Sequence, residues 1–341
     1  MSNFVMLSTT ILNMPDWLFW ILVFLIGSGL VFWIVSYFVA SFMVYDKTLR
    51  RKSKEQWSRN PSSLESKYLL MDGEGMKWFE ANKQYKKDVH IVSSGLSLYG
   101  EYYDFGSDRC AVILSGRTES LRYGYYFAVP YAKNGYNVLV LDPRGHGLSD
   151  GEFNTVGFEE SKDAIAWVKH IRDTFGISSF VFHGICIGAA AGMFALSSPD
   201  APDCIHGIVT EGMFPNFGES MKNHMIEKRK PVFPTFTFVD MWMKHYTGHS
   251  MKYGPINVIS GVRTPLLMLH SKEDLYSTPE YAEKLYSLSG SENKRLVWFP
   301  HGRHSMLRIT DTELYDGSIT EFLKTLPKIE NNNAKEKTNV L

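Results

Sequence analysis

The segment from Phe180 to Gly192 constrains the fold of this 341-residue chain more than any other. Its pattern predicts a buried strand, a sharp turn and a helix rich in small residues, with Cys186 at the turn. Gly184 and Gly188 flank Cys186 at two residues on either side, where only small residues let strand and helix approach closely. The helix would direct its N-terminus at Cys186, which favours a thiolate or an oxyanion there. The alternative is a structural cysteine beside packing glycines, and the other segments must decide between the two.

Strand and helix patterns alternate along the rest of the chain. A hairpin is predicted over residues 90–102, because two alternating runs flank Ser94-Gly95. Continuous apolar strands that alternate with helices predict an α/β fold, with a mostly parallel sheet covered by helices on both faces. Ligands of such sheets bind beyond the carboxyl ends of the strands. We expect strands at 111–114, 137–141, 180–183, 207–210, 265–269 and 295–299, and helices at 123–133, 158–174, 279–287 and 311–326.

Charge and cysteine content exclude several classes of protein. Lys plus Arg and Asp plus Glu both number 36, so no overall positive field favours nucleic acid as a partner. The three cysteines, Cys110, Cys186 and Cys204, form no paired framework and no CxxC motif. The histidines lack the spacing of metal ligands, so we expect neither a metal site nor a cofactor.

A long apolar run near the N-terminus predicts a membrane anchor. Residues 17–45 contain no charged side chain, and the run exceeds the ~20 residues needed to cross a bilayer. A basic stretch that includes Lys47, Arg50 and Arg51 follows, whereas no Lys or Arg precedes Trp17. The positive-inside bias therefore predicts a single-pass protein of the cell membrane, with its C-terminal domain in the cytoplasm. The same cluster could instead contact anionic headgroups.

The expected domain organisation follows from these patterns. We expect a short N-terminal segment at 1–16, a transmembrane anchor at 17–45, and a basic and helical linker at 46–86 that residues 72–75 interrupt. The α/β domain should cover 87–326, and a polar, disordered tail should follow at 327–341. The strand rhythm breaks at about 212–260, which is too long for a loop and predicts a helical cap over the site. The alternative is a structural excursion that does not contact substrate.

Polar loops follow four of the predicted strands, so they should meet at one edge of the sheet. The loop after residue 141 contains His146, which is more typical of a packing residue than of a catalytic base. Asp274 is the best candidate for an acid that orients a histidine, with Glu273 and Glu211 as rivals. The loop after the last strand offers two histidines, His301 and His304. The order nucleophile, acid, histidine distinguishes this set from chymotrypsin-like and subtilisin-like enzymes.

Four motifs together resemble the α/β-hydrolase superfamily: PRGHGLSDG, GICIGAA, TPLLMLHSKED and PHGRHSM. They are most similar to the branch of monoacylglycerol lipases, lysophospholipases and serine aminopeptidase S33-like esterases, including membrane-anchored bacterial members. The resemblance covers about residues 85–326. Two positions depart from it, since Cys replaces the usual Ser in the elbow and Ser115-Gly116 replaces the common His-Gly. The resemblance implies Cys186 as nucleophile, Asp274 as acid, His304 as base, and Arg117 and Ile187 as oxyanion-hole residues.

These motifs predict a membrane-anchored hydrolase. We expect it to cleave carboxylic esters or thioesters of a small-molecule or lipid acyl substrate through a covalent acyl-Cys186 intermediate. Trp242 and Phe238, in the aromatic and Met-rich run of the cap, are expected to contact the substrate. One alternative is an acyltransferase that uses the same acyl-Cys. Another is a catalytically silent binding protein that kept the fold.

Overall fold

An eight-stranded sheet forms the centre of the molecule, as seen in the computed structural model, which describes residues 14–61 and 65–327. The strand order is β1-β2-β4-β3-β5-β6-β7-β8. β1 pairs with β2 and β2 with β4 in antiparallel fashion, and the other neighbours are parallel. The mostly parallel sheet predicted from the sequence is therefore confirmed. The strands are β1 Lys86–Ser93, β2 Leu96–Tyr103, β3 Arg109–Leu114, β4 Asn137–Leu141, β5 Ser179–Ile185, β6 Ile205–Glu211, β7 Leu266–Ser271 and β8 Lys294–Phe299.

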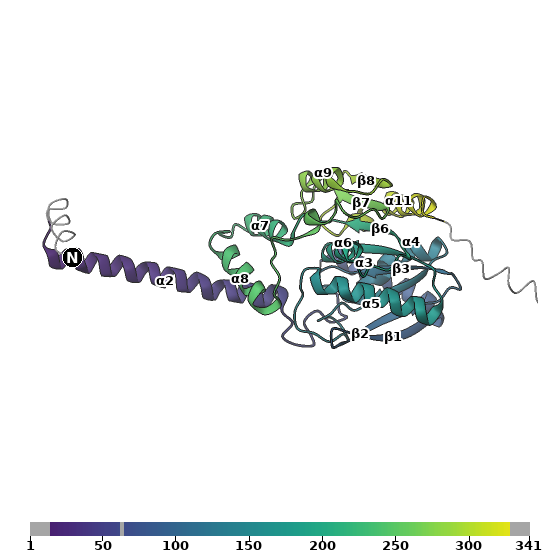
Figure 1. The fold of residues 1–341 in the computed structure, drawn as a ribbon, viewed down its shortest axis with the longest axis horizontal. Helices are drawn as coiled ribbons and strands as arrows, with labels where there is room; N and C mark the ends of the chain where they lie inside the picture. Colours follow the sequence, from purple (N-terminus) through teal and green to yellow (C-terminus); the bar gives the residue numbers. More distant parts are fainter. Residues whose placement is uncertain (1–13, 62–64, 328–341) are drawn as a thin grey trace, which may run out of the picture.

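Helices cover both faces of this sheet (Figure 1). Alternate strand residues point to opposite faces, so that Val112 packs into one apolar cluster and Ile113 into the other. The first cluster includes side chains of α5 Phe158–Phe175, α6 Ile187–Ser197 and α9 Pro279–Leu288. The second includes side chains of α3 Ser66–Asn82, α4 Leu121–Lys133 and α11 Thr312–Lys324. Shorter helices are η1 Lys83–Tyr85, η2 Pro255–Asn257 and α10 Leu307–Thr310.

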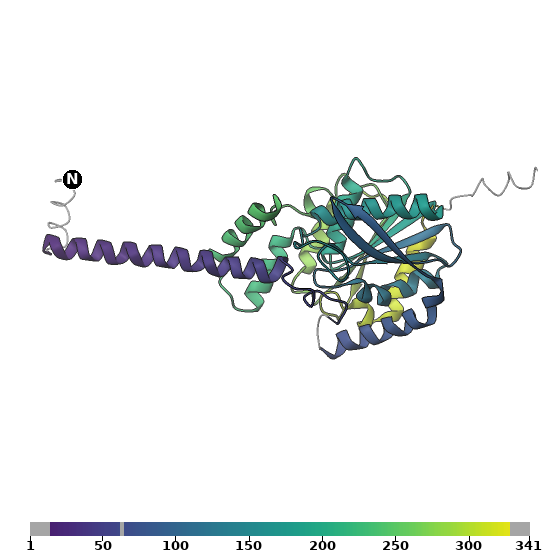
Figure 2. The ribbon, with the colours of Figure 1, turned by 90° about the horizontal axis from the view of Figure 1, so that it is seen from below.

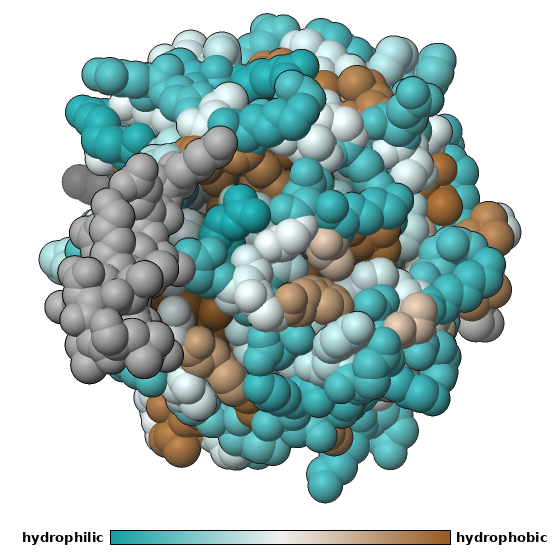
Figure 3. Space-filling view, turned by 90° about the vertical axis from the view of Figure 1, so that its right-hand side faces the viewer, coloured by the Kyte–Doolittle hydropathy of each residue, from teal (hydrophilic) through white to brown (hydrophobic). Residues whose placement is uncertain are grey.

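A long N-terminal helix, α2 Asp16–Leu49, projects from the domain (Figures 1 and 2). It is long and apolar enough to cross a membrane, and its most apolar stretch has no buried residue. Two helices between β6 and β7, α7 Phe217–Glu227 and α8 Thr235–Thr247, lie beside its C-terminal part. The insertion is therefore helical, as predicted. Figure 3 shows the opposite end of the domain, where most visible residues are hydrophilic and the hydrophobic patches are small.

The connector after the anchor differs from its prediction. Helix α3 runs without interruption through the Asp72-Gly73-Glu74-Gly75 sequence that was expected to break it. Packing explains the difference, because a Cβ added at Gly75 would lie 3.1 Å from the backbone nitrogen of Tyr126 in α4. Arg122 of α4 also donates two hydrogen bonds to Asp72, at 2.5 and 2.6 Å. Tertiary contacts thus outweigh the low helix propensity of glycine.

The stretch between α2 and α3 is also non-helical where it is described, and it is tied to the domain. The Arg51 side chain donates to the carbonyls of Gly147 and Ser149, at 3.0 and 3.4 Å. Trp57 stacks on the ring of His146 at a centroid distance of 4.6 Å. Among the basic residues of this region, Arg51 therefore holds the stretch against the domain, in addition to contributing positive charge. Most of the predicted N-terminal segment and nearly all of the predicted tail lie outside the described residues.

Candidate active site

Cys186 occupies a strained turn between β5 and α6. Its backbone φ is 54° and its ψ is −110°, a region that a residue with a side chain rarely adopts. A Cβ added at Gly184 would lie 2.5 Å from the Cα of Ala189, and one at Gly188 would lie 1.9 Å from the carbonyl oxygen of Leu114. Only glycine fits at either position. The Gly-x-Cys-x-Gly spacing therefore exists because strand, turn and helix touch backbone to backbone.

Asp274 and His304 form a buried pair beside this turn. The Nδ1 of His304 lies 2.7 Å from Oδ2 of Asp274, and the aspartate side chain is almost inaccessible to solvent. The other carboxylate oxygen of Asp274 accepts hydrogen bonds from the backbone N–H groups of Tyr276 and Ser277, at 2.8 and 2.9 Å. Gly212 has a φ of +61°, and a Cβ there would lie 2.9 Å from Cε1 of His304. Both partners are therefore held in place from several sides.

The charges of this pair reinforce each other. Burial lowers the pKa of His304, but the negative charges of Asp274 and Cys186 outweigh it and raise the pKa well above its usual value. Burial raises the pKa of Asp274, but the charge and hydrogen bond of His304 outweigh it and leave the pKa lowered. Because Nδ1 faces the carboxylate, the histidine donates there, and Nε2 is the nitrogen left for a reacting group. Nε2 is buried and has no hydrogen-bond partner among the described residues.

The rival acids are engaged elsewhere. Glu273 lies 2.9 Å from Nδ1 of His301, and both side chains are exposed, His301 at 77%. Glu211 is fully buried and accepts hydrogen bonds from the Tyr315 hydroxyl at 2.6 Å and from the Leu307 N–H at 2.9 Å. Of these carboxylates, Asp274 is the one that pairs with a histidine beside Cys186. The assignment of Asp274 and His304 as acid and base stays a prediction, and these contacts show which partner each rival carboxylate has instead.

The loop after β3 passes close to Cys186. A Cβ added at Gly116 would lie 3.8 Å from the Cβ of Cys186. Arg117 follows directly, and Ile187 is the first residue of α6, whose N–H has no acceptor within its own helix. The two N–H groups expected to bind an oxyanion thus come from segments that flank Cys186. The Arg117 side chain donates to the carbonyl of Thr48 in α2 at 2.9 Å, a contact with no signal in the sequence.

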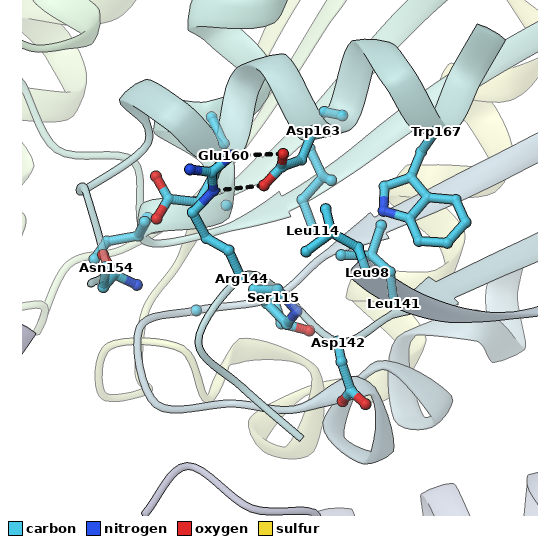
Figure 4. Close-up of a pocket in the computed structure, with 16 residues that line it drawn as sticks. Leu98, Leu114, Ser115, Leu141, Asp142, Arg144, Asn154, Glu160, Asp163 and Trp167 are labelled. Carbon is cyan, nitrogen blue, oxygen red and sulfur yellow. Dashed lines mark hydrogen bonds and ion pairs between the residues drawn. The ribbon is translucent and has the colours of Figure 1, made fainter. Parts of the chain in front are cut away.

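His146 supports this loop. The ring is fully buried, and its nitrogens lie 2.9 and 2.5 Å from the carbonyl oxygens of Arg144 and Arg117. A small pocket of about 20 Å³ lies beside the same segment (Figure 4). Figure 4 shows Arg144 reaching Asp163 of α5, with hydrogen bonds of 2.7 and 2.6 Å. These contacts hold the His146 loop against its neighbours, which is the packing role predicted for His146.

A cavity of about 710 Å³ brings the reacting groups together. Cys186, His304, Gly116 and Arg117 line it at one end. The other walls come from α7, which lies within the predicted cap, and from α2 and the start of α3, which the sequence did not connect to the site. The additional lining residues include Tyr37, Ala40, Val44, Lys47, Thr48, Tyr68, Tyr123, Phe217, Met221, His224 and Met225.

The expectation that Trp242 and Phe238 contact substrate is corrected by the structure. Among the described residues that line the cavity, neither is present. Both project from α8 toward α2, where Trp242 packs on Phe38 and Phe42 at centroid distances of 4.6 and 5.0 Å. Phe238 contacts Phe38 at 5.6 Å. The aromatic run of the cap therefore binds the anchor helix, because that helix offers an apolar surface of its own.

The described residues contain no group of three or more His, Cys, Asp or Glu side chains placed to hold a metal ion. The chemistry available at the site is that of a cysteine and a histidine that line one cavity, with an aspartate bound to the histidine.

Comparisons with known proteins agree with this geometry. A family model described as the alpha/beta hydrolase fold matches residues 112–236. The uncharacterised protein YqkD of Bacillus subtilis is 24% identical over 254 residues, which is 73% of this chain and 83% of YqkD. The lysophosphatidylserine lipase ABHD12 of Danio rerio is 24% identical over 165 residues, 46% of this chain and 40% of that protein. The esterase Pf2001 of Pyrococcus furiosus superposes with a TM-score of 0.61 at 24% identity, covering 73% of this chain and 94% of that one. The chain therefore has the α/β-hydrolase fold, with a mostly parallel eight-stranded sheet and helices on both of its faces.

Proposed function

We propose that this protein hydrolyses carboxylic ester or thioester bonds of lipophilic acyl substrates through a covalent acyl-Cys186 intermediate. The observation that carries the proposal is that Cys186 and His304 line the same cavity, with Nδ1 of His304 bound to Asp274. This leaves Nε2 free to exchange a proton with the sulfur and with the leaving group.

Acylation starts from the thiolate–imidazolium pair that forms when Nε2 of His304 takes the proton of the Cys186 thiol. The sulfur then attacks the acyl carbonyl carbon, and the carbonyl oxygen becomes an oxyanion held by the N–H groups of Arg117 and Ile187. The tetrahedral intermediate collapses when the bond to the leaving oxygen or sulfur breaks and His304 protonates that atom. Asp274 remains ionised throughout and stabilises the imidazolium. The products of this half-reaction are an alcohol or thiol and an acyl-Cys186 thioester.

Deacylation repeats these steps with water. His304 takes a proton from the water molecule as its oxygen attacks the thioester, and the same two N–H groups hold the second oxyanion. Collapse of this intermediate releases the carboxylic acid and returns the proton from His304 to the Cys186 sulfur. A thiolate is a good leaving group, so a cysteine in this position suits turnover of thioesters as well as esters.

The substrate class follows from the walls of the cavity. Phe217, Met221 and Met225 of α7 give it an apolar surface opposite α2, which suits an acyl chain. The names of two similar proteins, a lysophosphatidylserine lipase and an esterase, also describe enzymes that act on esters.

Helix α2 is proposed to anchor this enzyme in the cell membrane, because its length and composition suit a single span. The basic residues after it, such as Lys52 and Lys54, favour a cytoplasmic position for the catalytic domain. Protease added to spheroplasts should then leave the domain intact and cleave it only after lysis. Cleavage before lysis would reverse the orientation.

The activity is tested with the full-length protein in detergent micelles and a panel of p-nitrophenyl esters and acyl-thioesters. Cys186→Ala should abolish turnover, whereas Cys204→Ala, at a cysteine that is not among the residues lining the cavity, should retain it. Cys186→Ser should keep partial activity on esters and lose relatively more on thioesters. Undiminished turnover by Cys186→Ala would contradict the covalent mechanism.

The reaction products, or the lack of any reaction, distinguish a hydrolase from an acyltransferase and from a binding protein. Release of free acid supports hydrolysis, and transfer of the acyl group to an added alcohol or amine would instead identify an acyltransferase. A wild-type protein that reacts with no acyl substrate and no electrophilic acyl probe would be a binding protein of the same fold.

A further inference from the structure

The anchor helix divides into an exposed part and a packed part. No residue of α2 before Ser41 is buried, and contacts with the domain begin at Tyr37 and Phe38. Residues 16–36 extend for about 31 Å at ~1.5 Å per residue, close to the ~30 Å hydrocarbon core of a bilayer. When this part spans the membrane, Tyr37 lies at the interface. The cap, and the end of the cavity that Tyr37 lines, then lie where the helix leaves the bilayer.

Aromatic contacts fix the rotation of α2 about its axis. Phe38, Phe42 and Tyr45 project toward α8, where they pack on Trp242 and Tyr246. These three positions follow the i, i+4, i+7 spacing of one helix face. The neighbouring face is therefore held toward the site and cannot turn away without breaking this set of contacts.

That neighbouring face lines the catalytic cavity. Tyr37, Ala40, Val44, Lys47 and Thr48 all line it, at the spacing i, i+3, i+7, i+10 and i+11 of a single helical stripe. From Tyr37 to Thr48 the stripe rises by about 16 Å. Half of a ~30 Å hydrocarbon core is ~15 Å, which is the depth that one acyl chain of a lipid occupies. The stripe therefore has the length of a lipid acyl chain.

The stripe ends at the reacting groups. Arg117, beside Cys186, donates to the carbonyl of Thr48 at 2.9 Å. Leu49 is fully buried in the same apolar cluster as Ile187. Of the two residues proposed to bind the oxyanion, Arg117 thus contacts the last turn of α2 directly. Ile187 shares an apolar cluster with that turn.

We propose that the acyl chain of the substrate lies between α2 and α7, against the stripe Tyr37–Thr48, and that a membrane lipid enters the site from the bilayer along it. This rests on the proposed ester hydrolysis and adds the substrate class, a long-chain acyl lipid, and the residues that select it. Ala40 and Val44 are specificity-determining residues, because they form the apolar middle of the stripe. The anchor thereby supplies a wall of the active site as well as attachment.

The experiment compares two adjacent positions on the same helix, using full-length protein in phosphatidylglycerol–phosphatidylethanolamine vesicles. Ala40→Trp places a bulky ring in the cavity, whereas Val39→Trp places it on a side chain that is 51% exposed and does not line the cavity. Ala40→Trp should reduce kcat/KM for palmitoyl esters about tenfold or more and leave acetyl esters within about twofold of wild type. Val39→Trp should change neither. Val44→Phe should reproduce the selective loss.

Retained hydrolysis of acetyl esters shows that Ala40→Trp is folded. An unchanged chain-length profile in both Ala40→Trp and Val44→Phe, or the same loss in Val39→Trp, would overturn the inference. A palmitate analogue with a terminal diazirine provides a test that needs no turnover. Crosslinks to Ala40 or Val44 would support the acyl site even if every ester were inert. Inert esters together with such crosslinks would reject only the proposed hydrolysis. Ester hydrolysis without any crosslink to α2 would reject only the acyl site.

Discussion

Two acid–histidine pairs lie next to each other in the same two loops. Glu273 pairs with His301 and Asp274 pairs with His304, at similar distances of 2.9 and 2.7 Å. The His301 side chain is 77% exposed, whereas that of His304 is 11% exposed and shares the cavity with Cys186. Hydrogen-bond geometry is thus nearly the same in both pairs. Burial and the neighbouring sulfur make only one of them suitable for catalysis, because water screens the exposed charges.

The largest expected difference between the pairs comes from the histidines. His304→Ala should reduce turnover of p-nitrophenyl esters by several orders of magnitude, because it removes the proton acceptor and donor of both half-reactions. His301→Ala should stay within about twofold of wild type, because an exposed side chain outside the cavity touches no reacting group. Equal losses in the two variants, or a loss only in His301→Ala, would reverse the assignment.

The acids should differ less strongly. Asp274→Asn should lower kcat between roughly 10²- and 10⁴-fold with little change in KM, because it removes the carboxylate that orients and stabilises the imidazolium. Glu273→Gln is the matched control and should retain wild-type kcat. Comparable kcat values for these two amide variants would refute a special role for the buried pair.

A smaller but more specific effect concerns the titration of His304. Asp274 and Cys186 raise its pKa, so Asp274→Asn and Cys186→Ser should each lower that pKa. Glu273→Gln should leave it unchanged. NMR titration of the His304 ring carbon resonances measures these shifts directly. A His304 pKa that is insensitive to Asp274→Asn would mean that the two groups do not interact in solution as they do in the structure.

The smallest expected effect is on folding stability. The pKa of Asp274 is lowered in the fold, so its contribution is present above its unfolded pKa and is lost as pH falls through the folded value. The pKa of His304 is raised, so its contribution is complete below its unfolded pKa and is lost as pH rises through the folded value. The pair should therefore stabilise most between about pH 4 and pH 6.5. Thermal unfolding of wild type and Asp274→Asn across pH should differ most in that window, whereas Glu273→Gln should show no such maximum.

The parts of the site that could be predicted from the sequence depend on local backbone chemistry. The spacing around Cys186 requires glycine at 184 and 188, because backbone atoms meet there, and that requirement is visible in five consecutive residues. The strands were predictable because continuous apolar runs between helical patterns have few other folds. Asp274 followed from its position after a strand, whereas the choice of His304 over His301 came from the resemblance to the α/β-hydrolase superfamily.

The missing parts depend on tertiary contacts that no local pattern records. An apolar helix such as α2 does not reveal which of its faces packs on protein and which on lipid, since both faces are hydrophobic. The sequence therefore assigned Trp242 and Phe238 to the substrate, although they bind α2, and gave no reason to connect Thr48 with Arg117. Helix α3 was expected to break for a similar reason. The sequence does not show that Gly75 allows α4 to approach α3 closely.

The central claim is that Cys186 carries the acyl group, and a burst experiment tests it most directly. Full-length protein mixed with an excess of a p-nitrophenyl ester should release one p-nitrophenol per active chain before steady turnover. Rapid quenching and peptide mass spectrometry should find the acyl mass on the peptide that contains Cys186, and Cys186→Ala should show neither the burst nor the adduct. An acyl adduct confined to Cys110 or Cys204, or a burst that survives in Cys186→Ala, would contradict the account.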